Sequence, residues 1–387
     1  MPNFLSKRER EGLNERSGAG EESDWPGHRW LRKGGTDRGR CAAEYPGTEW
    51  IGCCDVDEKC GKQLAEDLGA DFFTTDYREL LARSEVNAAV LATDENEHAG
   101  TLWAAIEGGH KILVEKPLAT NAVESAKIVE AAEKAGSDLL VGYTQRFRRR
   151  WLIAKEQVSS GQLGDITSAT TRAFLNRMVG ITRLEVNEDR SKLSPMVISG
   201  THALDVIFWV LGEEKKPVEV YARSVEKTLT GIGTKDATFS IFTFEDGTLW
   251  SMSCCWSLPV VWPASTYSLE VGIVGTEGVL TIDDTHRDMV MASEKPWQTH
   301  RGRRDEKYVT FLGSYPPGDM VDGQFWGPMR EETNSWLARL YTGVKTPHAT
   351  GADGHRNLMM TMACDLSAKR KKPVALPVSP EEIEEDL

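Results

Sequence analysis

Glu115, Lys116 and Pro117 are the residues whose types and spacing most directly indicate chemistry. They follow 112–114, an aliphatic run without alternation that is typical of a parallel strand buried on both faces. Open α/β sheets bind ligands at the carboxyl ends of their strands, and proline stiffens the backbone there. The stretch therefore predicts a carboxylate and an ammonium facing a ligand crevice. A surface ion pair at a strand end is the alternative that these residues alone leave open.

The segments on either side supply the rest of such a sheet. Buried strands are predicted at 50–54, 87–92, 111–115 and 138–142, with helices at 57–68, before Gly108-Gly109, and at 121–135. This alternation indicates a parallel α/β sheet.

The second half of the chain has a different pattern. Short strands are predicted at 166–172, 218–222, 238–244, 248–255, 267–274 and 278–282, helices at 325–341 and 355–367, and an acidic, solvated tail from 379. Turn residues at 245–247 and 275–278 predict hairpins, so this sheet should be antiparallel.

The Glu-Lys-Pro motif after a buried strand, followed by a helix, a further strand and Arg146-Phe147, resembles the glucose-fructose oxidoreductase and inositol dehydrogenase family, called Gfo/Idh/MocA. The similarity extends from about residue 42 to 377. It implies an α/β fold with an N-terminal Rossmann-type parallel sheet and a C-terminal α+β domain with a large, mostly antiparallel sheet. We expect an irregular segment at 1–40, domains at 41–147 and 148–377, and the tail at 378–387.

The cofactor prediction is NAD, with NADP less favoured. Asp55 follows the strand at 50–54, where a Rossmann domain binds the adenosine ribose and where a carboxylate repels a 2′-phosphate. A simple helix cap is the alternative. Thr93 and His98 lie in the loop that the family places near the nicotinamide, although Asp94 replaces its usual proline and His98 could merely cap a helix. The motif at 115–117 completes the predicted cofactor-binding set.

Oxidising an alcohol requires a base for the hydroxyl proton and a donor to the oxygen. Histidine suits the first task, and His202 opens an apolar helix at 203–211. The resemblance gives His202 the role of general base and Lys116 that of donor to the substrate oxygen. Many family members carry Asp where this chain has Ile198. A helix-capping histidine is the alternative for His202.

Tyr143, Arg146, Asp205 and Trp256 are the predicted substrate-binding residues. Aromatic faces and a guanidinium suit a polyhydroxylated ring, while Asp205 belongs to the same family element as His202. The aromatic residues and the arginine are each more often packing residues than ligand contacts, and the alternative for Asp205 is that it holds its helix in place.

The composition of the chain limits its domain number, its partners, its metal sites and its location. A chain of 387 residues is long for one core, and its net charge of −13 argues against a nucleic-acid partner. Seven cysteines, including two adjacent pairs, do not form a disulfide framework, and the eight scattered histidines predict no metal site. No run approaches the ~20 apolar residues of a membrane span, so we expect a cytoplasmic protein.

The N-terminus departs from this pattern because residues 1–40 contain no buried strand and no Gly-x-Gly-x-x-Gly turn. Read one nucleotide later, codons for 28–36 exist that give Ile-Val-Gly-Cys-Gly-Lys-Ala-Gly. One hypothesis is therefore a frame-shifted first strand and turn. A genuinely divergent N-terminus is the other.

The predicted function is an NAD(P)-dependent oxidoreductase acting on a secondary hydroxyl of a sugar, cyclitol or similar ring. The alternative is a non-catalytic member, either regulatory or unable to bind the cofactor. In the resembled family the second-domain sheet commonly forms a subunit interface, which implies a homodimer or homotetramer.

Overall fold

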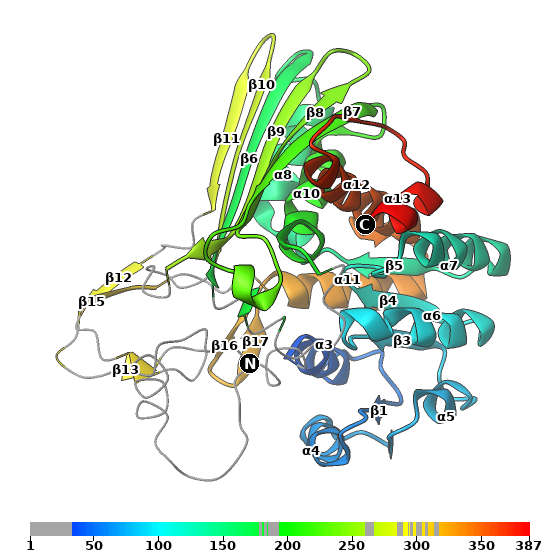
Figure 1. The fold of residues 1–387 in the computed structure, drawn as a ribbon. Helices are drawn as coiled ribbons and strands as arrows, with labels where there is room; N and C mark the ends of the chain where they lie inside the picture. The colour runs from blue at the N-terminus through cyan, green and yellow to red at the C-terminus, as the bar shows by residue number, and fades with distance from the viewer. Residues whose placement is uncertain are drawn as a thin grey trace.

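A computed structural model describes residues 33–177, 180–181, 184, 193–259, 267–284, 289–292, 294, 297–298, 304–305, 309–312 and 317–387. Its first part alternates strands and helices, and its second part forms one broad sheet that stands over the first (Figure 1). The predicted combination of a Rossmann-type domain and a sheet-rich α+β domain is confirmed.

The first domain contains short parallel strands joined by helices. Its elements are α3 (Lys33–Ala43), β1 (Gly52–Cys54), α4 (Glu58–Leu68), β2 (Phe72–Thr74), α5 (Tyr77–Leu81), β3 (Ala88–Leu91), η1 (Glu95–Glu97), α6 (His98–Glu107), β4 (Lys111–Glu115), α7 (Ala122–Ala135) and β5 (Leu139–Gly142). Strands β3, β4 and β5 pair in parallel, and β1 pairs with β2 as a separate parallel pair.

Local sequence explains where these helices begin. The Asp57 carboxylate accepts from the backbone N–H of Cys60 at the start of α4, and the Asn121 side chain accepts from that of Glu124 at the start of α7. Both are N-cap bonds that satisfy otherwise unpaired helix donors. Between the two helices, β4 is buried through its three aliphatic residues, as expected of a central parallel strand.

The prediction of an irregular segment up to residue 40 is wrong for its last part, because α3 starts at Lys33. Arg38 and Cys41 turn inward from this helix and are buried. The sequence pattern was misleading because glycines and charged residues alternate here without an apolar period. Of residues 28–36, to which the frame-shift hypothesis applies, 33–36 form the start of α3 and the others lie outside the described part of the chain.

The second domain is built on a seven-stranded sheet. Its elements up to the last large strand are η2 (Thr144–Phe147), α8 (Arg149–Ser159), β6 (Ile166–Asn176), the π-helical turn η3 (Met196–Gly200), α10 (Thr201–Leu211), β7 (Pro217–Val225), η4 (Thr230–Ile232), β8 (Ala237–Phe244), β9 (Leu249–Leu258), β10 (Tyr267–Gly275) and β11 (Val279–Asp284). With β19 (Val374–Ala375) at one edge, the order is β11-β10-β6-β9-β8-β7-β19. Strands β6 and β9 run parallel and the other neighbours antiparallel, so the prediction of a mostly antiparallel sheet is confirmed.

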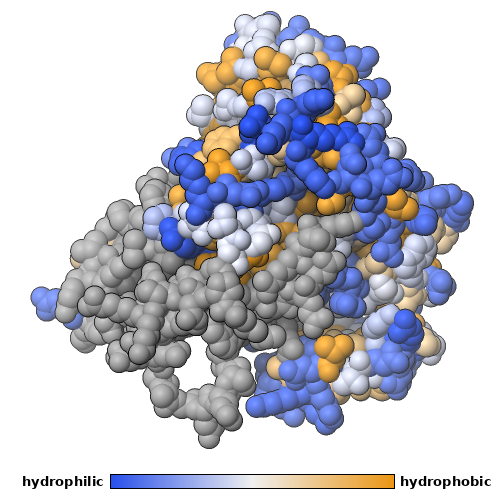
Figure 2. All heavy atoms as spheres, in the orientation of Figure 1, coloured by the Kyte–Doolittle hydropathy of each residue, from blue (hydrophilic) through white to orange (hydrophobic). Residues whose placement is uncertain are grey.

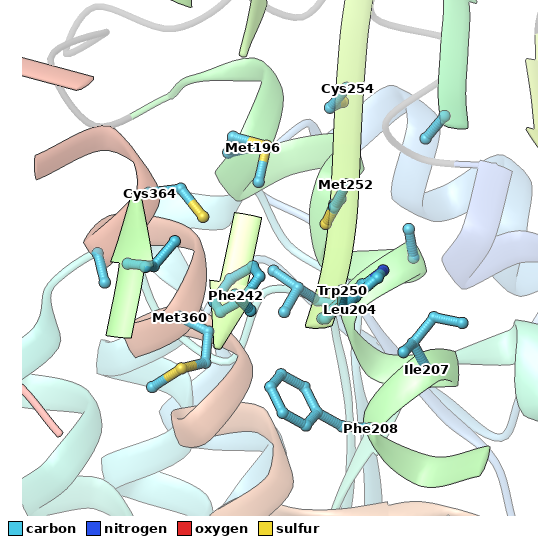
Figure 3. Close-up of a cluster of buried hydrophobic side chains, with 14 of the residues drawn as sticks. Met196, Leu204, Ile207, Phe208, Phe242, Trp250, Met252, Cys254, Met360 and Cys364 are labelled. Atoms are coloured by element: carbon cyan, nitrogen blue, oxygen red, sulfur yellow. The ribbon is translucent and has the colours of Figure 1, made fainter. Parts of the chain in front are cut away.

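One face of this sheet carries the main hydrophobic core. Helices α8, α10 and α12 (Gly351–Arg370) lie together on that side (Figure 1). Side chains alternate between buried and exposed along β8 and β9, as a sheet covered on one face requires. Phe208 of α10 meets Phe242 and Trp250 of the sheet, with Met360 and Cys364 of α12 beside them (Figure 3).

The chain then returns to the first domain. Its remaining elements are β12 (Met289–Ala292), β13 (Trp297–Gln298), β14 (Arg304–Asp305), β15 (Val309–Leu312), β16 (Asp319–Val321), β17 (Gln324–Trp326), α11 (Pro328–Thr342), β18 (Ala349–Thr350), α12 (Gly351–Arg370), β19 (Val374–Ala375) and α13 (Pro380–Asp386). Strand β18 pairs with β5, and Trp336 and Leu337 of α11 pack on Leu113 and Leu140 of the parallel sheet. The predicted boundary at residue 148 therefore does not separate the domains completely.

The prediction of a solvated acidic tail is also wrong. Residues 380–386 form α13, whose Ile383 is completely buried. The Glu384 carboxylate accepts from the Asn121 amide at 2.7 Å and from the backbone N–H of Ala122 at 2.6 Å. A carboxylate at a helix N-terminus is favourable, so these acidic residues help to fix α7.

All seven cysteines are free thiols, as the sequence predicted. None of the helices in the described part is long and apolar enough to cross a membrane.

Candidate active site

Lys116 and Tyr143 leave the parallel sheet at the same edge. In the register of β4 and β5, Glu115 is opposite Gly142, so the residues that follow them are neighbours where the strands end. The Lys116–Pro117 peptide bond is cis and forms the turn after β4. This is the strand end at which the sequence predicted a ligand crevice.

The ammonium of Lys116 reaches across to the second domain. Its Nζ donates a hydrogen bond of 3.1 Å to the backbone carbonyl of Ile198, within η3. This turn continues directly into α10, whose second residue is His202. π-Helical turns of this kind occur frequently at functional sites.

Tyr143 links the same strand end to His202. Its hydroxyl and the Thr201 hydroxyl are 2.7 Å apart, and its ring lies edge-on to the imidazole of His202, with centroids 6.2 Å apart. Burial raises the pKa of Tyr143, which therefore stays a neutral phenol. Lys116, Tyr143 and half-buried His202 thus gather where the two domains meet.

Arg146 and Asp205 are not available to a substrate, contrary to the prediction. They form a bidentate ion pair with N–O distances of 2.8 and 2.6 Å, and both are buried. The Asn357 amide donates to the same carboxylate at 2.9 Å. The pair joins η2, α10 and α12 and so holds the helix that carries His202.

Trp256 is likewise a packing residue and not a substrate contact. Its side chain is completely buried, and its indole N–H donates to the Ser199 hydroxyl at 2.8 Å. Tyr143, although adjacent to His202, is 1% exposed. Large aromatic side chains supply much of the apolar area in a core, and Trp256 has that role here.

His98 is buried between the two loops that follow β3 and β4. Its Nδ1 lies 2.7 Å from the carbonyl oxygen of Pro117, and its Nε2 lies 3.2 Å from that of Thr93. Burial lowers the pKa of His98, so a neutral ring donates to one of these oxygens. The predicted cofactor contact is replaced by a positioning role. Thr93 itself is exposed at the end of β3, consistent with its predicted place.

A buried charge network behind the motif was not predicted. The Arg38 guanidinium pairs with Glu115 at 2.7 Å and with Glu332 at 2.8 Å. Glu332 also accepts from the Thr144 hydroxyl. Burial acts to raise the pKa of Glu115, but the charge of Arg38 holds it below its ordinary value. Glu115 therefore anchors α3 to β4 and leaves Lys116 as the charged group of the motif that reaches the second domain.

The residues described here fit a dinucleotide. A Cβ added to Gly35, in the first turn of α3, would lie 3.3 Å from that of Ala92, so this glycine permits close approach of the helix to the end of β3. The start of α3 consequently faces the ligand edge, where helix N–H groups and the helix dipole favour a pyrophosphate. Half-buried Asp55 follows β1, as ribose binding requires, and the turn before α3 lies outside the described residues.

A two-domain fold with this edge and this triad of side chains defines a dinucleotide-dependent oxidoreductase. Two family models match the chain, "Oxidoreductase family, NAD-binding Rossmann fold" at residues 33–143 and "Oxidoreductase family, C-terminal alpha/beta domain" at residues 155–376. The chain therefore belongs to the Gfo/Idh/MocA oxidoreductase family, with NAD as its cofactor.

Several characterised proteins are similar over most of their length. Myo-inositol 2-dehydrogenase of Thermotoga maritima is 22% identical over 83% of this chain and 89% of its own. Inositol 2-dehydrogenase of Rubrobacter xylanophilus is 27% identical over 85% and 86%. Among solved structures, scyllo-inositol dehydrogenase of Lactobacillus casei with bound NAD(H) and scyllo-inositol has a TM-score of 0.71 at 16% identity, covering 90% of this chain and 97% of that one.

Proposed function

We propose that this protein is an NAD-dependent dehydrogenase that oxidises a secondary hydroxyl of a cyclitol or sugar ring. Relatives named as inositol dehydrogenases support the substrate class. The observation that carries the catalytic assignment is the hydrogen bond from Lys116 to Ile198, which brings the ammonium to the turn that leads into His202. A non-catalytic ligand-binding protein would not need an ammonium and an imidazole converging from two domains.

The two side chains have complementary tasks. Lys116 donates a hydrogen bond to the substrate oxygen and so stabilises negative charge as the proton leaves. His202 takes that proton, since an imidazole changes protonation near neutral pH. NAD, when bound, supplies the carbon that accepts the hydride. Where the resembled family often has Asp, this chain offers the backbone carbonyl of Ile198, which orients Lys116 without adding charge.

The experiment compares Lys116→Ala, His202→Ala and the control Lys111→Ala, which removes an exposed lysine at the start of the same strand. We expect kcat with inositol and NAD to fall by on the order of 10²-fold or more in the first two variants and to stay unchanged in the control. Fluorescence titration should give nearly equal NADH affinities for all four proteins, because neither assigned role is to bind the dinucleotide. Full turnover in His202→Ala would exclude it as the base.

A separate measurement distinguishes an enzyme from a non-catalytic member of the family. NADH binding without oxidation of any polyol or sugar in a substrate panel would favour a regulatory member. Absence of NADH binding, restored by a version carrying the Gly-x-Gly-x-x-Gly turn, would identify the N-terminus as the damaged part.

We also propose a homodimer or homotetramer formed through the uncovered face of the large sheet. Phe239, Ile241 and Leu249 are each about half exposed on neighbouring strands β8 and β9. Contiguous apolar side chains of this kind mark association sites, and a second copy is the commonest partner. Light scattering should give a multiple of the 43.0 kDa chain mass, and Ile241→Glu should shift it toward the monomer. Seven free thiols support a cytoplasmic, reducing location.

A further inference from the structure

A second pocket lies away from the ligand edge of the parallel sheet. It has a volume of about 540 Å³ and is enclosed by the end of β7, the loop before β8, the C-terminal half of α12 and the residues that open η3. Ligand sites commonly have volumes of ~300 to 1,000 Å³. The predicted cofactor and substrate residues do not line it.

The pocket contains a buried carboxylate. Asp365 is 4% exposed, and its oxygens accept from the Lys235 ammonium at 3.0 Å and from the Ser194 hydroxyl. Lys235 and Asp365 neutralise each other, so this pair contributes little net charge to the pocket.

The other charged side chains that line the pocket are mostly cationic. Arg223, Lys369 and Lys371 stand against Glu226 and the α-carboxylate of Leu387, an excess of one positive charge. This contrasts with the net charge of −13 of the whole chain. Hydrophilic side chains gather over the end of α12 and over α13 in the space-filling view (Figure 2). A concave site with an excess of positive charge attracts anionic ligands.

We propose that this pocket binds a small dianionic metabolite, either a phosphate monoester or a dicarboxylate. Arg223 and Lys371 pair with its two charges, and the apolar part of the ligand contacts Val197 and Met362. Arginine suits both candidate groups because its planar donors match carboxylate and phosphate oxygens.

The pocket is connected to Lys116 through a short chain of hydrogen bonds. The Ser194 hydroxyl donates to Asp365 and accepts from the backbone N–H of Val197 at 3.1 Å. The backbone carbonyl of Ser194 accepts from Ile198 at 3.0 Å, and the carbonyl of Ile198 accepts from Lys116. An anion that draws Lys235 away from Asp365 therefore alters the turn that orients Lys116. This coupling rests on the catalytic role proposed for Lys116, whereas binding of the dianion to the pocket does not.

Binding is tested by isothermal titration calorimetry of the full chain, saturated with NADH, against inorganic phosphate, phenyl phosphate and succinate, with acetate as the monoanionic control. The variant Arg223→Ala/Lys371→Asn removes two cations, and asparagine suits position 371 because Lys371 has a φ of 58°. Lys345→Ala, which removes an exposed lysine outside the pocket, is the matched control. We expect saturable binding of a dianion, weakened at least tenfold in the double variant and unchanged in the control.

Stronger binding of phenyl phosphate or of succinate identifies which dianion the site prefers, and either supports the proposal. Absence of saturable binding by all three dianions, equal affinity in the double variant, or equal affinity for acetate would overturn it.

Coupling is tested by the dependence of kcat on the bound dianion. We expect at least a threefold change in kcat at saturating NAD and substrate, abolished in Arg223→Ala/Lys371→Asn and retained in Lys345→Ala. Binding with an unchanged kcat would contradict the coupling and leave the site intact. A protein that binds the dianion but oxidises no substrate would instead refute the proposed function, so the two failures are distinguishable.

Discussion

The ammonium of Lys116 and the backbone carbonyl of Ile198 are joined by a hydrogen bond of 3.1 Å, although the residues are 82 positions apart. This contact crosses from the parallel sheet to the turn that leads into α10, the helix that carries His202. The catalytic pair proposed here therefore depends on the two domains holding their relative positions. Buried networks around the pair provide that constraint, and each makes a measurable contribution.

Removal of the Arg38 side chain should strongly destabilise the protein. Arg38→Met leaves the carboxylates of Glu115 and Glu332 buried without their cation, which costs about 3 to 5 kcal/mol of unfolding free energy. Urea denaturation followed by tryptophan fluorescence measures the loss. The control is Arg172→Met, which breaks an exposed pair with Glu270 and should cost at most about 1 kcal/mol. Equal losses in the two variants would mean that the buried network contributes no more to the unfolding free energy than the exposed pair does.

The pair of Arg146 and Asp205 should affect stability and leave substrate binding alone. Asp205→Asn removes the nearer of the two carboxylates that compensate Arg146, the other being Asp353 at 3.4 Å, and we expect a loss of about 3 kcal/mol. The double variant Arg146→Met/Asp205→Asn should recover part of it, since no buried charge is then left uncompensated while Asn357 keeps an acceptor. Its KM for inositol should stay within threefold of the original value. A KM raised tenfold or more in the refolded double variant would indicate that Arg146 contacts the substrate.

The terminal helix α13 should contribute to stability as a docked element. Ile383→Ala removes a completely buried side chain, and such truncations cost about 2 to 5 kcal/mol. Thermal unfolding should show the loss as a lower Tm. Ile153→Ala, at a position that is 44% exposed, is the matched control and should change Tm little. A tail that was only solvated would give no difference between the two.

Acid should destabilise the protein partly through His348. Burial, with the charge of Arg38, lowers the pKa of His348 from 6.5 to about 3, so the folded protein keeps this ring neutral where the unfolded chain protonates it. The resulting stability is present above pH 6.5 and is lost as the pH falls from 6.5 toward 3. Between pH 7.5 and 5.5 this amounts to about 1.4 kcal/mol.

The measurement is the change in unfolding free energy between those two pH values, for the original protein and for His348→Asn. The variant lacks the titrating ring and should lose about 1.4 kcal/mol less than the original protein over this interval. The variant His355→Asn, at a half-buried histidine, is measured over the same pH interval for comparison. Identical pH dependences of the original protein and His348→Asn would mean that His348 titrates normally in the fold.

Much of the fold could be predicted from local sequence. The strand at Lys111–Glu115 has the predicted bounds, and α7 begins one residue after the predicted helix start at Asn121, which is its N-cap. The strand follows from its run of aliphatic residues and the helix from its apolar period and the cap at Asn121, all signals within a few positions of each other. The start of α3 at Lys33 was missed because it is stabilised by Arg38 contacting carboxylates far along the chain.

The candidate site was predicted less completely than the fold. Residue types and the family motif identified Lys116 and His202, but they also suggested that Arg146, Asp205 and Trp256 face a substrate. An arginine or a tryptophan looks the same in the sequence whether its side chain contacts a ligand or a buried group of the protein. Only the fold supplies Asp205 as the partner of Arg146 and Ser199 as the partner of Trp256.

The sequence by itself determined the order of strands and helices, the two-domain organisation and the residues able to transfer a proton, because these depend on side-chain chemistry and on contacts within a few residues. Tertiary structure decided which charged groups remain at the site and which are consumed in ion pairs. Arg38 and Glu332 illustrate the reason, since they are 294 residues apart and are brought to 2.8 Å only when the chain returns to its first domain.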